Sequence, residues 1–196
     1  YNDVEKYAKR NPFYQQYNLS VGKTTDNNMF KTSITYRDNK QADRYTDDQS
    51  MGVNLTNNLE ITKWLKLDIG TYNYYQKQNK QSYDALSPGY KYMPYDVLKN
   101  TDGSNYTSLA SSRLTKDNYA LISDYGLYNM DITPLNELGL NRAKTNSFQN
   151  RTYGRLNIAF AEWLNFSSMF QYEYGSDQYS KLSTKDSYAV RSRVNN

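Results

Sequence analysis

The sequence predicts an all-β protein made of antiparallel strands, each with one apolar and one polar face. Three observations favour this fold class. Six segments alternate apolar and polar residues with a period of two, which is the period of a half-buried strand. The connections between these segments are short and long in turn. The chain also holds few dependable core residues, since its 37% of apolar residues includes 22 tyrosines among 196 residues.

Each predicted strand carries its apolar residues on one side. The second strand, for example, alternates Phe30, Ile34 and Tyr36 with Lys31 and Arg37. Because the side-chain period is two, a slip of one residue would exchange the two faces of a strand. The six segments are residues 17–23, 30–37, 51–60, 65–70, 155–160 and 164–174.

The connection lengths favour a membrane barrel over a two-sheet sandwich, which the alternation alone also allows. Residues 24–28, 61–63 and 161–162 are compact joins, whereas residues 39–49, 76–146 and 175–196 are long and polar. Outer-membrane barrels show this rhythm, with short periplasmic turns and long extracellular loops. We therefore expect an antiparallel transmembrane β-barrel segment of about six strands, in contact with a lipid bilayer.

Aromatic residues lie where a barrel would meet the two membrane surfaces. Trp64 and Trp163 occupy equivalent places in a weak repeat, at two of the short joins, and Tyr36 and Tyr172 lie toward the opposite ends of their strands. Amphipathic rings favour the headgroup zone, so we expect these four to be membrane-interface aromatics. Two ordinary hairpins with aromatic cross-strand pairs are the alternative interpretation.

Charged residues on the polar side of the strands are expected to avoid lipid. An Arg or Lys at a lipid-facing position near the bilayer midplane costs roughly 2–4 kcal/mol. We expect these residues to face the lumen or a plug inside it, and to dock such a plug rather than line a path. They are Lys31, Arg37, Asp68, Arg155 and Glu173.

Composition excludes several chemistries. With no cysteine and no histidine, the chain has no Ser-His-Asp or Cys-His triad, no ordinary zinc site and no disulfide framework. No catalytic residue, metal or cofactor is expected, and the protein is not expected to be an enzyme. The net charge is +4, but basic residues are scattered among acids and no nucleic-acid module is present, so no nucleic-acid partner is expected.

Five phrases, in this order, resemble the SusC/RagA family of TonB-linked outer-membrane transporters over about residues 11–194. The phrases are Gln16–Gly22, Ile61–Leu67, Tyr95–Gly103, Ile132–Leu138 and Tyr153–Asn157. The resemblance implies a plugged 22-stranded barrel in the outer membrane of a Gram-negative bacterium. It implies import of glycans or peptides, driven by TonB through parts outside this chain, with a SusD-like surface lipoprotein as a lid.

On this interpretation the chain is one piece of a longer protein. Residues 1–16 are expected to be an entry segment following the plug, 17–75 the first four barrel strands and 76–146 a long extracellular loop. Residues 147–174 are expected to form strands five and six, and 175–196 the start of a further extracellular loop.

The long loop is the predicted place of ligand contact. Aromatic faces stack on sugar rings, while amides and carboxylates bond hydroxyl groups. Packing within the loop is the alternative role for any one tyrosine. The expected ligand- or lid-contacting residues are Tyr83, Tyr90, Tyr92, Tyr95 and Tyr125.

Three details stay open at this point. Tyr72 and Tyr74 fall in the polar register of their strand, which indicates either a bulge or a place above the bilayer. Residues 102–105 resemble a calcium loop only faintly, and a turn is expected. Two other functions also fit the strands: a secreted tyrosine-rich glycan-binding or adhesive β-domain, and a porin or assembly barrel independent of TonB.

Overall fold

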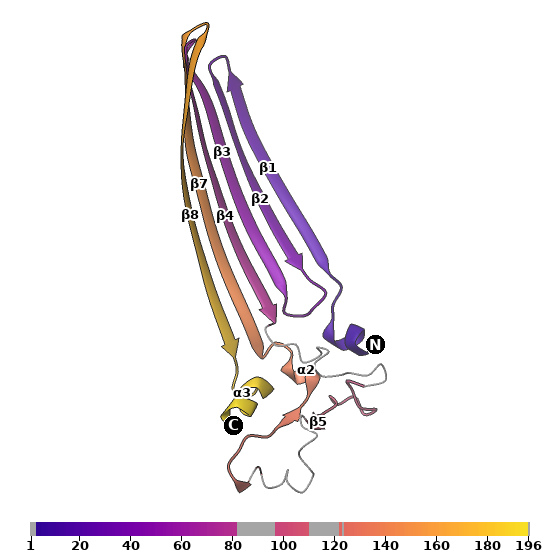
Figure 1. Ribbon diagram of the computed structural model, residues 1–196. Coiled ribbons are helices and arrows are strands. Elements are labelled where there is room, and N and C mark those ends of the chain that lie inside the picture. The colour runs from indigo at the N-terminus through magenta and orange to yellow at the C-terminus, as the bar shows by residue number, and fades with distance from the viewer. Residues whose placement is uncertain (1–2, 82–96, 110–121, 123, 196) are drawn as a thin grey trace.

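Most of the described chain forms one antiparallel sheet of six strands, in the order β1-β2-β3-β4-β7-β8 (Figure 1). A computed structural model describes residues 3–81, 97–109, 122 and 124–195. The predicted all-β fold class is confirmed. The sheet strands are β1 (Phe13–Thr25), β2 (Asn28–Lys40), β3 (Asp47–Thr62), β4 (Leu65–Gln81), β7 (Asn141–Ala161) and β8 (Leu164–Ser183).

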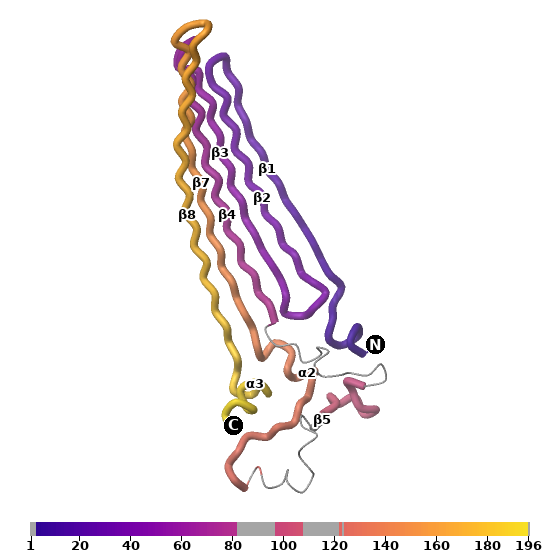
Figure 2. The backbone as a smooth tube through the Cα atoms, in the orientation of Figure 1, coloured from indigo at the N-terminus to yellow at the C-terminus, as the bar shows by residue number. Residues whose placement is uncertain are grey.

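Smaller elements gather at one end of the sheet (Figure 2). A turn of π-helix, η1 (Val4–Ala8), precedes β1, and a helix, α3 (Tyr188–Val194), follows β8. Between β4 and β7 lie a two-stranded sheet of β5 (Ser108–Leu109) and β6 (Asp131–Ile132), then the single helical turn α2 (Pro134–Glu137). We call this the loop end, and the opposite end, with turns at residues 26–27, 63–64 and 162–163, the short-turn end.

The strands are longer than the apolar alternation predicts. β1 begins at Phe13, β4 continues to Gln81, β7 begins at Asn141 and β8 continues to Ser183. The predicted boundaries at residues 16, 75, 146 and 174 are therefore wrong by several residues. The reason is that the backbone ladder continues through polar sequence, as in the pairing of Gln81 with Arg142. Side-chain hydropathy carries no signal for such pairing.

Strand register places the apolar residues of neighbouring strands in rows on one face. One row runs Tyr17, Tyr36, Met51, Tyr75 and Phe148, from β1 to β7. The adjacent residues in each strand point to the other face, because side chains alternate along a strand. We call the two sides the apolar face and the polar face.

Neither face of the sheet is covered by another layer of described residues. Among these residues the buried hydrophobic side chains are Ala8, Leu98 and Ile132, all from the loop end. The accessible surface is 13991 Å², whereas a folded monomer of 22.9 kDa exposes about 9,600 Å². The sheet thus has no hydrophobic core of its own. No helix among the described residues is long and apolar enough to cross a membrane.

Candidate functional site: two faces and one end of the sheet

The apolar face carries a band of large apolar side chains that begins at the short-turn end, many of them exposed. On β4 the band extends from Leu65 to Tyr75, ten residue steps along the strand. At about 3.3 Å per residue and a tilt of about 45°, this length covers about 23 Å in height, close to the apolar band of about 25 Å on outer-membrane barrels. Large exposed side chains of this face include Leu19, Val21, Ile34, Met51, Ile69, Phe148, Phe166 and Phe170.

A small hydrogen-bonded polar cluster interrupts this band where β4 pairs with β7. The Thr71 and Thr152 hydroxyls lie 3.0 Å apart, and Asn150 Nδ2 donates to Asn73 Oδ1 at 2.7 Å. Each pair faces its partner directly across the two strands. Because these groups satisfy one another, the cluster does not leave unpaired polar groups on the apolar face.

The predicted interface aromatics lie at two levels. Trp64 and Trp163 are 53% and 84% exposed at neighbouring short turns, where the Ala159 N–H donates to the Trp64 carbonyl at 2.8 Å. Tyr36 lies four residues from the loop end of β2. Tyr172 lies nearer the middle of its strand, because β8 continues to Ser183.

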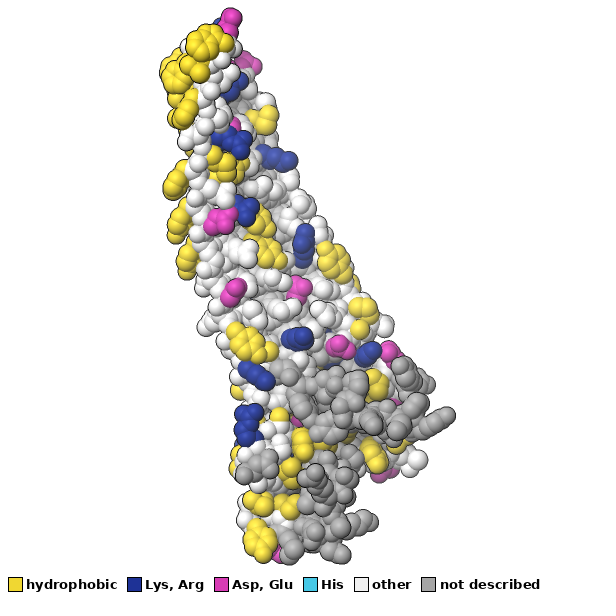
Figure 3. All heavy atoms as spheres, in the orientation of Figure 1, with side chains coloured by type: hydrophobic (Ala, Val, Ile, Leu, Met, Phe, Trp, Pro, Cys, Tyr) yellow, Lys and Arg dark blue, Asp and Glu magenta, His cyan; other side chains and the backbone are white. Residues whose placement is uncertain are grey.

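All five predicted lumen- or plug-facing residues lie on the polar face. Acidic and basic side chains are spread along the face of the sheet turned to the viewer in Figure 3, and hydrophobic side chains line its left edge, where β8 runs. Asp68 and Arg155 are directly opposed across β4 and β7, and Lys31 and Arg37 alternate with apolar residues on β2. Glu173 forms an ion pair of 2.7 Å with Arg151 Nε.

The centre of the polar face is a groove floored by tyrosine rings. It has a volume of about 430 Å³ and lies over β2, β3, β4 and β7. The Tyr72 and Tyr74 rings are nearly parallel, with an interplanar angle of 13° and centroids 6.2 Å apart. Both rings lie beside the position that a side chain at residue 52 would occupy, and the ring of Tyr153 lies over Gly70. We call this the tyrosine groove.

Glycine at position 70 is what permits this arrangement. A Cβ added there would overlap Tyr153 Cε1, far closer than van der Waals contact. Covering a strand glycine with a cross-strand aromatic ring also shields the exposed backbone. The bulge considered for Tyr72 and Tyr74 is wrong, because the β3–β4 register is continuous there and shifts only between Glu60 and Thr62.

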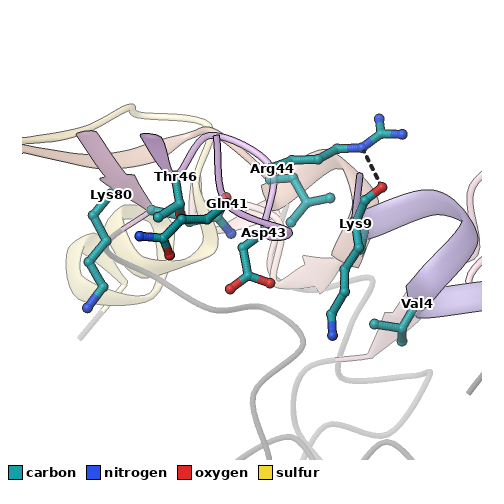
Figure 4. A pocket seen from close by; sticks show the side chains of 10 residues that line it. Val4, Lys9, Gln41, Asp43, Arg44, Thr46 and Lys80 are labelled. Carbon is teal, nitrogen blue, oxygen red and sulfur yellow. Dashed lines mark hydrogen bonds between the residues drawn. The ribbon is translucent and has the colours of Figure 1, made fainter. Parts of the chain in front are cut away.

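A second pocket lies at the loop end, between η1, the β2–β3 connection and the end of β4. Its volume is about 540 Å³. Figure 4 shows the charged ends of Lys9, Asp43 and Lys80 pointing toward the same side. The Arg44 Nε atom donates to the Lys9 carbonyl at 3.3 Å, which ties the β2–β3 connection to the segment before β1. The mixed charges at this pocket define no single ligand class.

The loop end is held together by a buried ion pair that sequence reasoning missed. Glu137 of α2 is 2% exposed, and its carboxylate accepts from Arg191 Nη2 at 3.1 Å and from the Tyr188 N–H at 2.9 and 3.0 Å. Arg191 also donates to the carbonyls of Asn129 and Asp131. We call this the Glu137–Arg191 clamp. It fixes α3 against the connection between β4 and β7, where only a loop was expected.

Of the predicted contact tyrosines, one lies in the described part of the chain. Tyr125 is 77% exposed at the loop end. Tyr83, Tyr90, Tyr92 and Tyr95 lie outside the described residues. No group of three or more acids is placed to hold a metal ion within residues 3–81, 97–109, 122 and 124–195.

Residues 102–105 form the predicted turn. The Ser104 hydroxyl donates to Asp102 Oδ1 at 2.7 Å, the Ser104 N–H donates to the same oxygen at 2.9 Å, and Gly103 has φ of +84°. These hydrogen bonds, the hydroxyl's first, hold the pKa of Asp102 below its ordinary value. The turn resembles an Asx turn.

Ser104→Ala is expected to raise the pKa of Asp102 toward its ordinary value, because the hydroxyl donor to the carboxylate is lost. A depressed folded-state pKa means that the turn is stabilised above the unfolded-state pKa, and that this stabilisation is lost as the pH falls through the folded value. A ¹³C NMR titration of the Asp102 carboxyl measures this. Ser104→Thr keeps the hydroxyl and should keep the pKa low; equal pKa values in all three proteins would refute the assignment.

Comparisons with known proteins add no family. No family model matches the chain, and no curated protein matches it.

Proposed function

We propose that this chain is a wall segment of an outer-membrane β-barrel that imports glycans or peptides in a TonB-dependent manner, without catalysis of its own. One observation carries the proposal. The sheet is a single layer whose apolar face exposes large apolar side chains over the half toward the short-turn end, while Lys31, Arg37, Asp68, Arg155 and Glu173 lie on the polar face. Lipid on one side and water or protein on the other would satisfy both faces.

The edges of the sheet support a closed barrel. β1 and β8 each pair with one neighbour among the described strands, so each has a free edge. Long unpaired edges invite aggregation, and barrels remove them by closing the sheet. Further strands pairing with β1 and β8 would complete the backbone hydrogen bonding that a bilayer demands.

The importer function follows from the resemblance to SusC/RagA transporters together with the polarity of the two faces. In this proposal Lys31, Arg37, Asp68, Arg155 and Glu173 face the lumen or a plug domain inside it, and the loop end meets the outside of a Gram-negative cell. A SusD-like lipoprotein would then close over the loop end near Tyr125, and TonB would act through parts outside this chain.

Single spin labels test the orientation of the faces, and because these 196 residues hold no cysteine, each introduced cysteine is the only one among them. Labels at Ile69 and Phe166 are expected to be accessible to oxygen and shielded from a water-soluble nickel complex in the membrane-bound protein. Labels at the adjacent positions Asp68 and Ser167 are matched controls and should lack this lipid signature. Solvated labels at Ile69 and Phe166 would refute the membrane proposal.

Cell fractionation supplies an independent result. The protein is expected in the outer membrane, with a mobility on denaturing gels that changes on boiling. A soluble band near 22.9 kDa that boiling does not shift would favour the secreted glycan-binding domain instead. An outer-membrane barrel without a plug sequence in the same reading frame would favour a porin.

A further inference from the structure

We propose that the tyrosine groove is a binding site for a saccharide that carries a carboxylate. This inference rests on the proposed function in one respect, since the polar face must be reachable from the lumen. It narrows the cargo from glycans or peptides to acidic glycans, and it places a contact site on the wall of the sheet rather than in the loops.

The floor of the groove is suited to a flat ring. Tyr153 lies over Gly70, and the Tyr72 and Tyr74 rings reach over Gly52. The two glycines leave room for the aromatic side chains to lie across the neighbouring strands instead of standing away from the sheet. Tyr72, Tyr74 and Tyr153 all line the groove, and the electron-rich face of a tyrosine ring attracts the polarised C–H bonds of a sugar.

The rim of the groove consists of small hydrogen-bonding groups. Ser33, Thr35, Ser50 and Asn54 supply hydroxyl and amide groups, and no Val, Ile, Leu, Met or Phe lines the groove. Recognition of a peptide generally needs pockets for alternate side chains, and an aliphatic pocket is missing here. The rim instead matches the many hydroxyl groups of a saccharide.

The positive charge of Arg37 favours a saccharide with an acidic group over a neutral one. Arg151 is paired with Glu173 at 2.7 Å, but Arg37 donates to a neutral acceptor, Gln16 Oε1, at 3.0 Å. Among the described residues Arg37 forms no ion pair within 4.0 Å. A guanidinium without a counter-charge at the edge of the groove fits a carboxylate in a two-pronged hydrogen-bonded contact.

Calorimetric titration of the full-length protein in detergent tests the site, with an oligogalacturonate as the acidic probe and a maltooligosaccharide as the neutral one. Arg37→Gln is expected to weaken oligogalacturonate binding about tenfold, because a charge-assisted hydrogen bond is lost, and to change binding of the neutral probe little. Arg155→Gln removes the same charge on the same face outside the groove and should leave both affinities unchanged.

A pair of glycine substitutions tests the aromatic floor. Gly70→Ala places a methyl group where Tyr153 lies, so the ring must move and oligogalacturonate affinity is expected to fall about tenfold, as in Tyr153→Ala. Gly154→Ala is the matched control. Nothing lies within 4 Å of a Cβ added at residue 154, and this residue lies on the apolar face, away from the groove. Equal affinities in the two glycine variants would overturn the role of Tyr153.

The outcomes separate this inference from the proposed function. Absence of oligogalacturonate binding in a protein with outer-membrane location and heat-shifted mobility would overturn the saccharide site and leave the barrel standing. Binding of an oligoglutamate peptide but not of oligogalacturonate would also overturn it. Acidic-saccharide binding by a protein found soluble would support the site while refuting the barrel.

Discussion

With the apolar face in lipid, as proposed above, Phe170→Arg is expected to destabilise the protein in a bilayer by about 2–4 kcal/mol, the cost of an arginine at a lipid-facing position near the bilayer midplane. Phe170 lies on the apolar face opposite Gly154, six residues into β8, and is 74% exposed. In water an exposed phenylalanine could be replaced by arginine at little cost. Denaturant unfolding in phospholipid vesicles, followed by the heat-dependent gel shift, measures the difference.

The adjacent residue provides the control. Gln171 lies on the polar face, where its amide donates to Glu173 at 2.6 Å. Gln171→Arg keeps a donor for that carboxylate and should change the free energy of unfolding by no more than about 0.5 kcal/mol. Equal stabilities of the two arginine variants would contradict the assignment of the apolar face to lipid.

Glu137→Ala is expected to release α3 from the loop end. The substitution leaves Arg191 partly buried without its acid and removes the acceptor of the Tyr188 N–H. Breaking a buried ion pair by removing one partner costs about 3–5 kcal/mol. Hydrogen–deuterium exchange should therefore show loss of protection over residues 184–195, with the sheet strands unchanged.

Two variants test whether burial is the cause of this loss. Glu60→Ala breaks an exposed ion pair with Lys66 and should cost no more than about 1 kcal/mol. The double variant Glu137→Leu/Arg191→Met replaces both charges with apolar groups, so it should lose less protection than Glu137→Ala. A double variant that unfolds α3 as fully as the single one would show that the hydrogen bonds of Glu137 and Arg191 to the backbone of Tyr188, Asn129 and Asp131 hold the helix, and that the unpaired buried charge is not the cause.

The six strands were predictable because their apolar residues repeat with the strand period. Phe30, Ile34 and Tyr36, for instance, share one face of β2. The strand ends were not predictable, because Gln81 and Arg142 pair through their backbones. Pro134 at the start of α2 is a helix-start signal that the sequence itself displays. α3 was not predictable, since its anchor Glu137 lies 54 residues from Arg191 along the chain.

The candidate site was predicted only in part. The alternation placed Arg37 and Glu173 on the polar side, and it placed Tyr72 in the polar register as an irregularity. The place of the Tyr72 ring in the groove depends on Gly52, which lies on the neighbouring strand β3. The place of the Tyr153 ring depends on Gly70, which lies opposite Tyr153 across β4 and β7. Such cross-strand pairs follow from the sheet register, which hydropathy determines only to within two residues.

The pairing of β4 with β7 also bears on how the protein folds. These two strands are joined by the whole connection between Gln81 and Asn141, so no tight turn sets their alignment. A slip of two residues would keep every side chain on the same face of the sheet. The burial of apolar side chains alone would therefore not disfavour the slipped alignment. Such a slip would place Tyr153 opposite Asp68 or Tyr72 in place of Gly70, and would separate the paired Thr71–Thr152 and Asn73–Asn150 side chains. These contacts are present in the observed register and lost in either two-residue slip, so they favour a single alignment of the β7–β8 hairpin on the β3–β4 hairpin.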